Sequence, residues 1–419
     1  MKNILVIGLG RYGTHLARKM QELGNDVMIV DKEEEAIEEL AANFTDSFIG
    51  DCKNEGVLRS LGINNFDICF VCIGRDFQAS LEITSMLKEL GAKKVVSVAK
   101  RDRQAYLLKN IGADDTIYPE REIAEKIALS GGRAYYVGGF VRDRLLGFSN
   151  KDIDIEVHGI IPDKLREIVS ETGKILEMGE SFGIFSLKGT DIDIAMPRKE
   201  TLTGRGHRDF EVSVDPFIGT EKAALRRDFT VNALMEDVLS GEVVDHYGGI
   251  EDLKNGILRH VSDESFPEDP LRVLRLAQFA ARFGFSVCEA TKELCRAIDL
   301  SSLSKERIEG EMKKALLKSQ KPSVFFEVLR DVNGLDYWFP ELKSLIGLPQ
   351  NPVYHPEGDV WVHTVQVLDR AASFRDKVSE PYSFMLSALC HDLGKIEATE
   401  EINGVIHAYA HESKGLPVV

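Results

Sequence analysis

The chain has 419 residues, of which 43% are hydrophobic, and a formal net charge of −16. This length predicts two to four domains with cores of their own. The negative charge argues against a protein that coats nucleic acid non-specifically, although a local basic surface could still bind RNA. The first residues, MKNILVIGLG, lack a basic leader, a cleavage site and a long apolar stretch. We therefore expect a soluble, cytoplasmic protein without a membrane span.

Residues 1–128 alternate short apolar runs with segments of helical periodicity. The runs include NILVIGLG, DVMIVD and DICFVCIG, and helix-like segments such as GTHLARKMQELG lie between them. Nearly continuous apolar strands that alternate with helices are typical of a parallel sheet covered on both faces. We therefore expect an α/β, Rossmann-like domain in this part of the chain.

Six cysteines are typical of a protein with a reduced interior. Cys69 and Cys72 match C-x-x-C, but they lie inside a continuous apolar run that predicts a buried strand. Three-residue spacing on a strand directs two side chains to opposite faces. We therefore predict neither a disulfide nor a metal site at this pair.

Gly8, Gly10 and Gly13 have G-x-G-x-x-G spacing between an expected strand and an expected helix. Such glycines permit a tight turn and let backbone N–H groups approach phosphates at a helix N-terminus. Asp31 ends the next expected strand, where a carboxylate can accept hydrogen bonds from ribose hydroxyls. The pattern predicts a nucleotide site; the alternative is a Rossmann scaffold whose pocket is only structural.

Four segments of this domain resemble, in their order, the RCK N-terminal (TrkA-N type) domain: VIGLGRYG, IGDCKNEGVLRSLGI, VCIGRDFQASL and NIGADDTIYPEREIAEKIA. That family supplies nucleotide-binding regulatory subunits of potassium transporters and channels. The resemblance implies a site for NAD, ATP or ADP, a homodimer through this domain, and a potassium transporter as partner. The implied cofactor-binding residues are Gly8, Gly10, Arg11, Gly13, Asp31 and Asp51.

A second glycine turn follows without a linker, in the segment YYVGGFVRDRLLG. Gly138 and Gly139 leave room for a triphosphate, and Arg142 can offer it a planar cation. Asp152 and Asp154, one residue apart on an expected strand, point to the same face, where they can share divalent cations. Paired Mg²⁺ ions held in this way could activate an attacking hydroxyl and stabilise a leaving pyrophosphate.

From about residue 131, several motifs follow one another as in bacterial CCA-adding enzymes, the class II tRNA nucleotidyltransferases of the poly(A) polymerase family. They include VGGFVRDRLLG, KDIDI, LRRDFTVNAL and EDPLRVLRLAQFAARFGF. The resemblance implies transfer of CMP and AMP from CTP and ATP to the 3′ end of tRNA. It also implies an α+β nucleotidyltransferase head at 131–255, an all-α neck at 256–345 and a partial HD domain at 346–419.

The same resemblance assigns roles to individual residues. Asp152 and Asp154 would be catalytic and hold Mg²⁺, while Asp269 and Arg272 would read the base edge, since a carboxylate accepts from an exocyclic amine and arginine donates to ring acceptors. The other implied nucleotide-binding residues are Gly138, Gly139, Arg142, Asp143, Arg227, Asp228, Asn232 and Arg275. Gln278 stands where the family usually has arginine, which predicts weaker triphosphate binding.

A second acidic triplet, GTDIDIAM, leaves two alternatives open. One of Asp191 and Asp193 would supply a third carboxylate to the metals, or both would belong to a polar strand face.

The segments YHPEGDVWVHT and LCHDLGK extend the resemblance into the HD domain. His363, His391 and Asp392 match the first metal ligands of an HD phosphohydrolase, and His411 falls where a further histidine is expected. Because the sequence ends at Val419, before the aspartate that closes such a site, we expect weak divalent-metal binding rather than an active phosphodiesterase.

Two functions therefore compete. The first is template-independent nucleotidyl transfer to tRNA, carried out by the second glycine loop. The alternative is an RCK-type nucleotide sensor for potassium transport whose transferase portion is non-functional.

Overall fold

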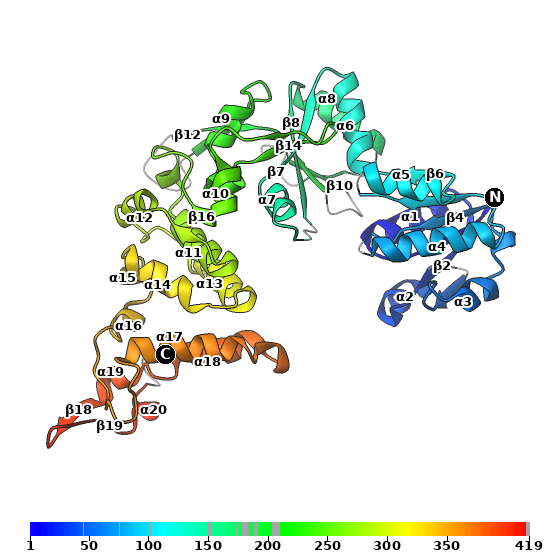
Figure 1. Cartoon of the computed structure of the whole chain (residues 1–419). Helices are drawn as coiled ribbons and strands as arrows, with labels where there is room; N and C mark the ends of the chain where they lie inside the picture. The colour runs from blue at the N-terminus through cyan, green and yellow to red at the C-terminus, as the bar shows by residue number, and fades with distance from the viewer. Residues whose placement is uncertain are drawn as a thin grey trace.

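The computed structural model describes residues 1–44, 46–74, 76–100, 102–148, 152–172, 175–177, 184–187, 192–202 and 210–415 (Figure 1). In this part of the chain, every helix is too short or too polar to cross a lipid bilayer.

The N-terminal unit is a six-stranded parallel sheet with the strand order β3-β2-β1-β4-β5-β6. Its strands are β1 (Asn3–Ile7), β2 (Asp26–Asp31), β3 (Asp46–Ile49), β4 (Ile68–Val71), β5 (Val95–Val98) and β6 (Asp115–Ile117). The helices between them are α1 (Arg11–Glu22), α2 (Glu34–Ala41), α3 (Glu55–Ser60), α4 (Phe77–Glu89) and α5 (Asp102–Asn110). The expected Rossmann-like α/β unit is confirmed.

Both faces of this sheet are covered by hydrophobic cores. Along β1, Leu5 belongs to one core and Val6 to the other, as the two-residue period of a strand requires. Cys69 and Cys72 likewise enter opposite cores, and all six cysteines are free thiols. Burial raises the pKa of both thiols to about 12, so they are unreactive at neutral pH. The two thiols therefore lie on opposite faces of the sheet, as their three-residue spacing predicts.

Helix α6 (Pro119–Leu129) follows β6 directly but packs against the next unit, on α8 and β7 (Figure 1). Its inward side chains Ile123, Ala124 and Ile127 share a core with the strands of that unit. The division at residue 128 stays a prediction, and this packing favours a boundary before Pro119.

The second unit is a seven-stranded mixed sheet with the order β15-β14-β7-β8-β11-β10-β9. Its strands are β7 (Arg133–Val137), β8 (Ile153–His158), β9 (Ile175–Glu177), β10 (Ile184–Leu187), β11 (Ile192–Ala195), β14 (Met235–Asp237) and β15 (Val243–Val244). The accompanying helices are α7 (Gly139–Leu145), α8 (Pro162–Thr172), α9 (Thr220–Leu225) and α10 (Gly249–Asn255), and a separate ribbon joins β12 (Arg198–Leu202) to β13 (Phe210–Val214). The predicted α+β head is therefore present.

Helices dominate the rest of the chain. They are α11 (Leu271–Phe283), α12 (Glu289–Arg296), α13 (Lys305–Lys318), α14 (Ser323–Asp331), α15 (Leu335–Trp338), α16 (Pro340–Lys343), α17 (Val360–Ala372), α18 (Pro381–Cys390), α19 (Lys395–Ala398) and α20 (His411–Lys414). Two small strand pairs accompany them: β16 (Ile257–Leu258) with β17 (Ser286–Val287), and β18 (Thr399–Ile402) with β19 (Val405–Ala408).

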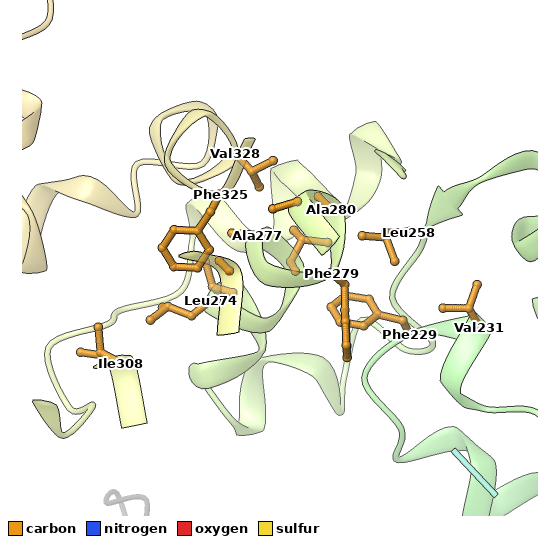
Figure 2. Close-up of a cluster of buried hydrophobic side chains, with 14 of the residues drawn as sticks. Phe229, Val231, Leu258, Leu274, Ala277, Phe279, Ala280, Ile308, Phe325 and Val328 are labelled. Carbon is orange, nitrogen blue, oxygen red and sulfur yellow. The ribbon is translucent and has the colours of Figure 1, made fainter. Parts of the chain in front are cut away.

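Helix α11 joins the head to the helical part. It packs against α13 and α14, and Phe279 on it lies 5.7 Å from the ring of Phe229 in the head (Figure 2). Figure 2 shows this aromatic pair in the same cluster as Leu274 and Phe325. Because head and neck share one hydrophobic core, residues of α11 are held at a constant position relative to the head sheet.

Candidate active site

The second glycine loop connects β7 to α7. Gly138 has φ 66° and ψ −134°, a conformation that side chains rarely adopt, and a Cβ there would lie 3.3 Å from Arg227 Nη1. This position therefore requires glycine for its backbone conformation, and its neighbour is an arginine from another element.

Three acidic residues lie near the N-terminal ends of β8 and β11, two adjacent inner strands of the head sheet. Asp154 on β8 is paired in parallel register with Asp193 on β11, and Asp152 lies just before β8. Desolvation raises the pKa of Asp154, Arg227 opposes this, and repulsion from Asp193 and Asp152 raises the pKa further. A divalent cation would offset this repulsion between neighbouring carboxylates, and carboxylate oxygens are its preferred ligands. Asp191 lies outside the described residues.

A cavity of about 330 Å³ opens beside these carboxylates. Asp154 and Asp193 line it together with four arginines: Arg198, Arg226, Arg227 and Arg272. Arg227 is held by an ion pair of 3.1 Å with Glu156, on the same strand as Asp154. The cavity therefore combines ligands for a cation with fixed positive charges for a polyanion. Arg198 and Arg226 were not among the predicted site residues. Arg226 lies beside Arg227 in the recognised motif LRRDFTVNAL, which could have indicated it, whereas Arg198 lies outside the recognised motifs.

Arg142 does not line this cavity. Only 4% of the residue is exposed, and its guanidinium donates to Asp143 and Asn232 and lies over the ring of Phe283. In this structure Arg142 links α7 to the neck through its contact with Phe283 on α11. Its contact with a triphosphate stays a prediction.

The same network contains Asp228 and Arg275. Asn232 donates to Asp228 Oδ1 at 2.9 Å, and Arg275 donates to Asp228 Oδ2 at 2.8 Å. Burial alone would raise the pKa of Asp228, but Arg275, Asn232 and the backbone amide of Phe229 hold it below its usual value. A hydrogen-bonded network of charged and polar side chains thus connects head and neck. It consists of Asp143, Arg142, Asn232, Asp228 and Arg275.

The two residues expected to read bases have different surroundings. Arg272 lines the cavity, and it donates to the backbone oxygens of Ser265 and Arg226. Asp269 forms an ion pair of 2.9 Å with Arg307 on α13. Their joint role in base reading stays a prediction. Gln278 is buried in the α11 core, so its effect on a triphosphate would be indirect.

The N-terminal unit has a pocket of its own, of about 420 Å³. Gly8, Gly10, Asp31 and Asp51 line it, and Asp31 Oδ2 accepts a hydrogen bond of 2.6 Å from the loop amide of Leu9. Lys32, Lys53 and Asp76 also line it and were not predicted.

Gly13 has a different role in this loop. A Cβ at Gly13 would lie 1.9 Å from the carbonyl oxygen of Gly8, so the close approach of helix to loop requires glycine. The side chain of Arg11 is outside the described part of the chain.

A histidine cluster surrounds Asp392, which is 2% exposed. The Nε2 atoms of His391, His411 and His363 lie 3.3, 3.5 and 3.7 Å from its carboxylate oxygens. Lys395 Nζ lies 2.8 Å from Asp392 Oδ2. Burial would raise the pKa of Asp392, but His391 and Lys395 hold it well below its usual range. The structure thus brings the four predicted HD residues together.

Three family models match the chain in order. The TrkA-N domain matches residues 4–119, the poly A polymerase head domain 134–259, and the probable RNA and SrmB- binding site of polymerase A 284–346. The first match ends at residue 119, where α6 begins. This agrees with the domain boundary before Pro119 that the packing of α6 favours.

The chain is 41% identical over 292 residues to the multifunctional CCA protein of Pasteurella multocida, covering 68% of this chain and 67% of that protein. The chain belongs to the multifunctional CCA protein family. It is 42% identical over 287 residues to the relative from Laribacter hongkongensis, over 68% of this chain and 67% of that one.

Among solved structures, this CCA-family chain is similar to a tRNA-processing enzyme in apo form 2. The TM-score is 0.49 and the identity 25%, over 65% of this chain and 73% of the other. The predicted resemblance to CCA-adding nucleotidyltransferases and the TrkA-N domain is confirmed by the relatives and the family models.

Proposed function

We propose that the protein transfers CMP and AMP from CTP and ATP to the 3′ end of tRNA. This proposal rests on one observation: Asp154 and Asp193 line the same cavity as four arginines. Membership in the multifunctional CCA protein family supports it.

The residues of the cavity divide the chemistry between them. Asp152, Asp154 and Asp193 present oxygen ligands that suit Mg²⁺. When bound, the cation supplies activation of the attacking 3′ hydroxyl and stabilisation of the leaving pyrophosphate. Arg227, oriented by Glu156, and the neighbouring arginines bind the negative charge of the triphosphate. Asp193 is proposed as the third carboxylate because it stands in register with Asp154.

The test is incorporation of labelled CTP and ATP into tRNA that lacks its 3′ CCA, in the presence of Mg²⁺. We expect addition of C, C and A in that order. No incorporation by a folded chain that still binds NAD or ATP would contradict the proposal and favour the sensor alternative.

The N-terminal pocket carries a second proposed function, the binding of NAD or an adenine nucleotide. Its supports are the pocket beside Gly8 and Gly10, the acidic Asp31 at the end of β2, and the TrkA-N match. A homodimer through this unit and a potassium transporter as partner stay predictions.

Gly10→Asp should weaken this binding strongly without unfolding the unit. A Cβ at Gly10 meets nothing within 4 Å, so the new carboxylate is accommodated but repels a phosphate. Isothermal titration of the full chain with NAD, and separately with ATP, should show at least about a tenfold rise in Kd, or about 1.4 kcal/mol.

Asn64→Asp is the matched control, since it adds the same charge at an exposed position outside the pocket. Unchanged affinity in Gly10→Asp, or an equal loss in the control, would contradict the assignment of the pocket.

A further inference from the structure

The histidines around Asp392 share one orientation. His391 Nδ1 lies 2.9 Å from the carbonyl oxygen of Ala388, and His411 Nδ1 lies 2.9 Å from that of Ala408. A carbonyl oxygen only accepts, so each Nδ1 carries the proton and each Nε2 is left to face Asp392. Metal-binding histidines are commonly oriented in this way by an acceptor behind the ring.

The distances around Asp392 suit a metal ion. Two ligands of one tetrahedral metal, each about 2.1 Å from it, lie about 3.4 Å apart. The three Nε2-to-carboxylate separations, 3.3, 3.5 and 3.7 Å, are close to this value. Donor atoms of His363, His391 and Asp392 all lie within 4.8 Å of one another, and Lys395 Nζ lies 2.8 Å from the buried Asp392 Oδ2. The donor set therefore fits a divalent cation.

His363 has a carboxylate behind its ring in place of a carbonyl. Glu357 Oε1 lies 2.6 Å from His363 Nδ1 and 3.0 Å from His355 Nδ1. A separation of 2.6 Å is a hydrogen bond, and it is shorter than the spacing of about 3.4 Å between two ligands of one metal. Glu357 is therefore placed to orient His363 rather than to bind the same ion.

The loop before α17 holds Glu357 in place. Asp359 caps the helix by accepting from Val362 N at 2.8 Å and also accepts from Gly347 N at 2.7 Å. Gln350 donates to the carbonyl oxygen of Gly358 and accepts from Lys395, which contacts Asp392. The segment 350–359, which carries Glu357, is thus connected to the histidine cluster at both ends: through Gln350 to Lys395, and through Asp359 to the helix that carries His363.

We propose that Glu357 is a positioning residue of this metal site: it accepts the Nδ1 proton of His363 and so presents Nε2 to a metal bound at Asp392. His355, the second donor to Glu357, packs edge-on against His363 with ring centroids 4.7 Å apart and keeps the ring from turning. This role is independent of nucleotidyl transfer.

The probe is Co²⁺, titrated into the full chain and followed by its visible absorption and by calorimetry. The Co²⁺ signal of this site is the difference between the parent and the His391→Ala variant. Glu357→Ala should weaken that Co²⁺ binding about 10- to 100-fold. Glu357→Gln, whose amide oxygen still accepts a hydrogen bond, should retain most of the affinity. Asp376→Asn is the control, because this side chain is 93% exposed and lies between α17 and α18. This variant should bind Co²⁺ with the affinity of the parent.

A second readout does not depend on metal. In ¹⁵N-histidine NMR spectra, His363 of the parent should be the Nδ1–H tautomer, and Glu357→Ala should shift it towards a mixture. Parent-like Co²⁺ affinity and tautomer in Glu357→Ala would overturn the proposal, as would a parent chain without a His391-dependent signal. If Glu357→Gln loses as much affinity as Glu357→Ala while keeping the tautomer, Glu357 is itself a ligand and the proposal fails. Should Glu357→Ala not fold, the Gln variant and its spectrum decide.

Discussion

Asp154→Asn should lower CMP incorporation into tRNA lacking its 3′ end by about a thousandfold, because losing a metal ligand removes several kcal/mol of transition-state stabilisation. The same variant should melt at a higher temperature than the parent. In the folded parent, the pKa of the Asp154 carboxyl is raised above its unfolded value of about 3.9. The ionised carboxylate therefore destabilises the folded state at a pH above that value. Removing that charge therefore stabilises the fold at pH 7. Steady-state incorporation and thermal unfolding at pH 7 measure the two effects.

Asp193→Asn decides between the alternatives that the sequence leaves open. A loss comparable with that of Asp154→Asn identifies a third metal-binding carboxylate, and near-parent turnover identifies a polar strand face. Glu221→Gln on α9, outside the cavity, is the control and should keep full activity. An Asp154→Asn protein that turns over at the parent rate would refute the assignment of this acid.

A transferase fragment that begins at Gly131 should be much less stable than one that begins at Tyr118. The shorter fragment loses α6, whose Ile123 and Ile127 are 0% exposed in the core of the head. Burial of each isoleucine contributes about 1.5–3 kcal/mol, so about 3–6 kcal/mol is lost from a total of about 5–15 kcal/mol. Urea unfolding followed by the fluorescence of Trp338 and Trp361 would measure the difference.

Two substitutions on α6 provide a matched pair in the full chain. Ile127→Ala should destabilise the head by about 2–5 kcal/mol, whereas Leu129→Ala, at a side chain 90% exposed, should have almost no effect. Fragments of equal stability, or equal effects of the two substitutions, would show that α6 is not part of the head.

Local patterns in the sequence were sufficient for much of this protein. The continuous apolar run in NILVIGLG predicted a strand buried on both faces, and the spacing of Cys69 and Cys72 placed them in opposite cores. Gly8 and Gly138 have positive φ angles, and Gly13 lies too close to the backbone of Gly8 for a side chain. Such conformations and contacts require glycine, a residue type that is directly visible in the sequence.

Other features depend on which surfaces meet, and only the tertiary structure decided them. The periodicity of α6 shows that one face is buried, but an apolar face packs equally well on either neighbouring sheet, and here it packs on the head. Arg142 has the same charge beside a triphosphate or beneath Phe283, and its position depends on Asn232, 90 residues away. Asp193 faces Asp154 through strand register, and Glu357 meets His363 through a capped loop. Motifs are determined by local backbone geometry, whereas partners are determined by the packing of distant segments, which local periodicity does not encode.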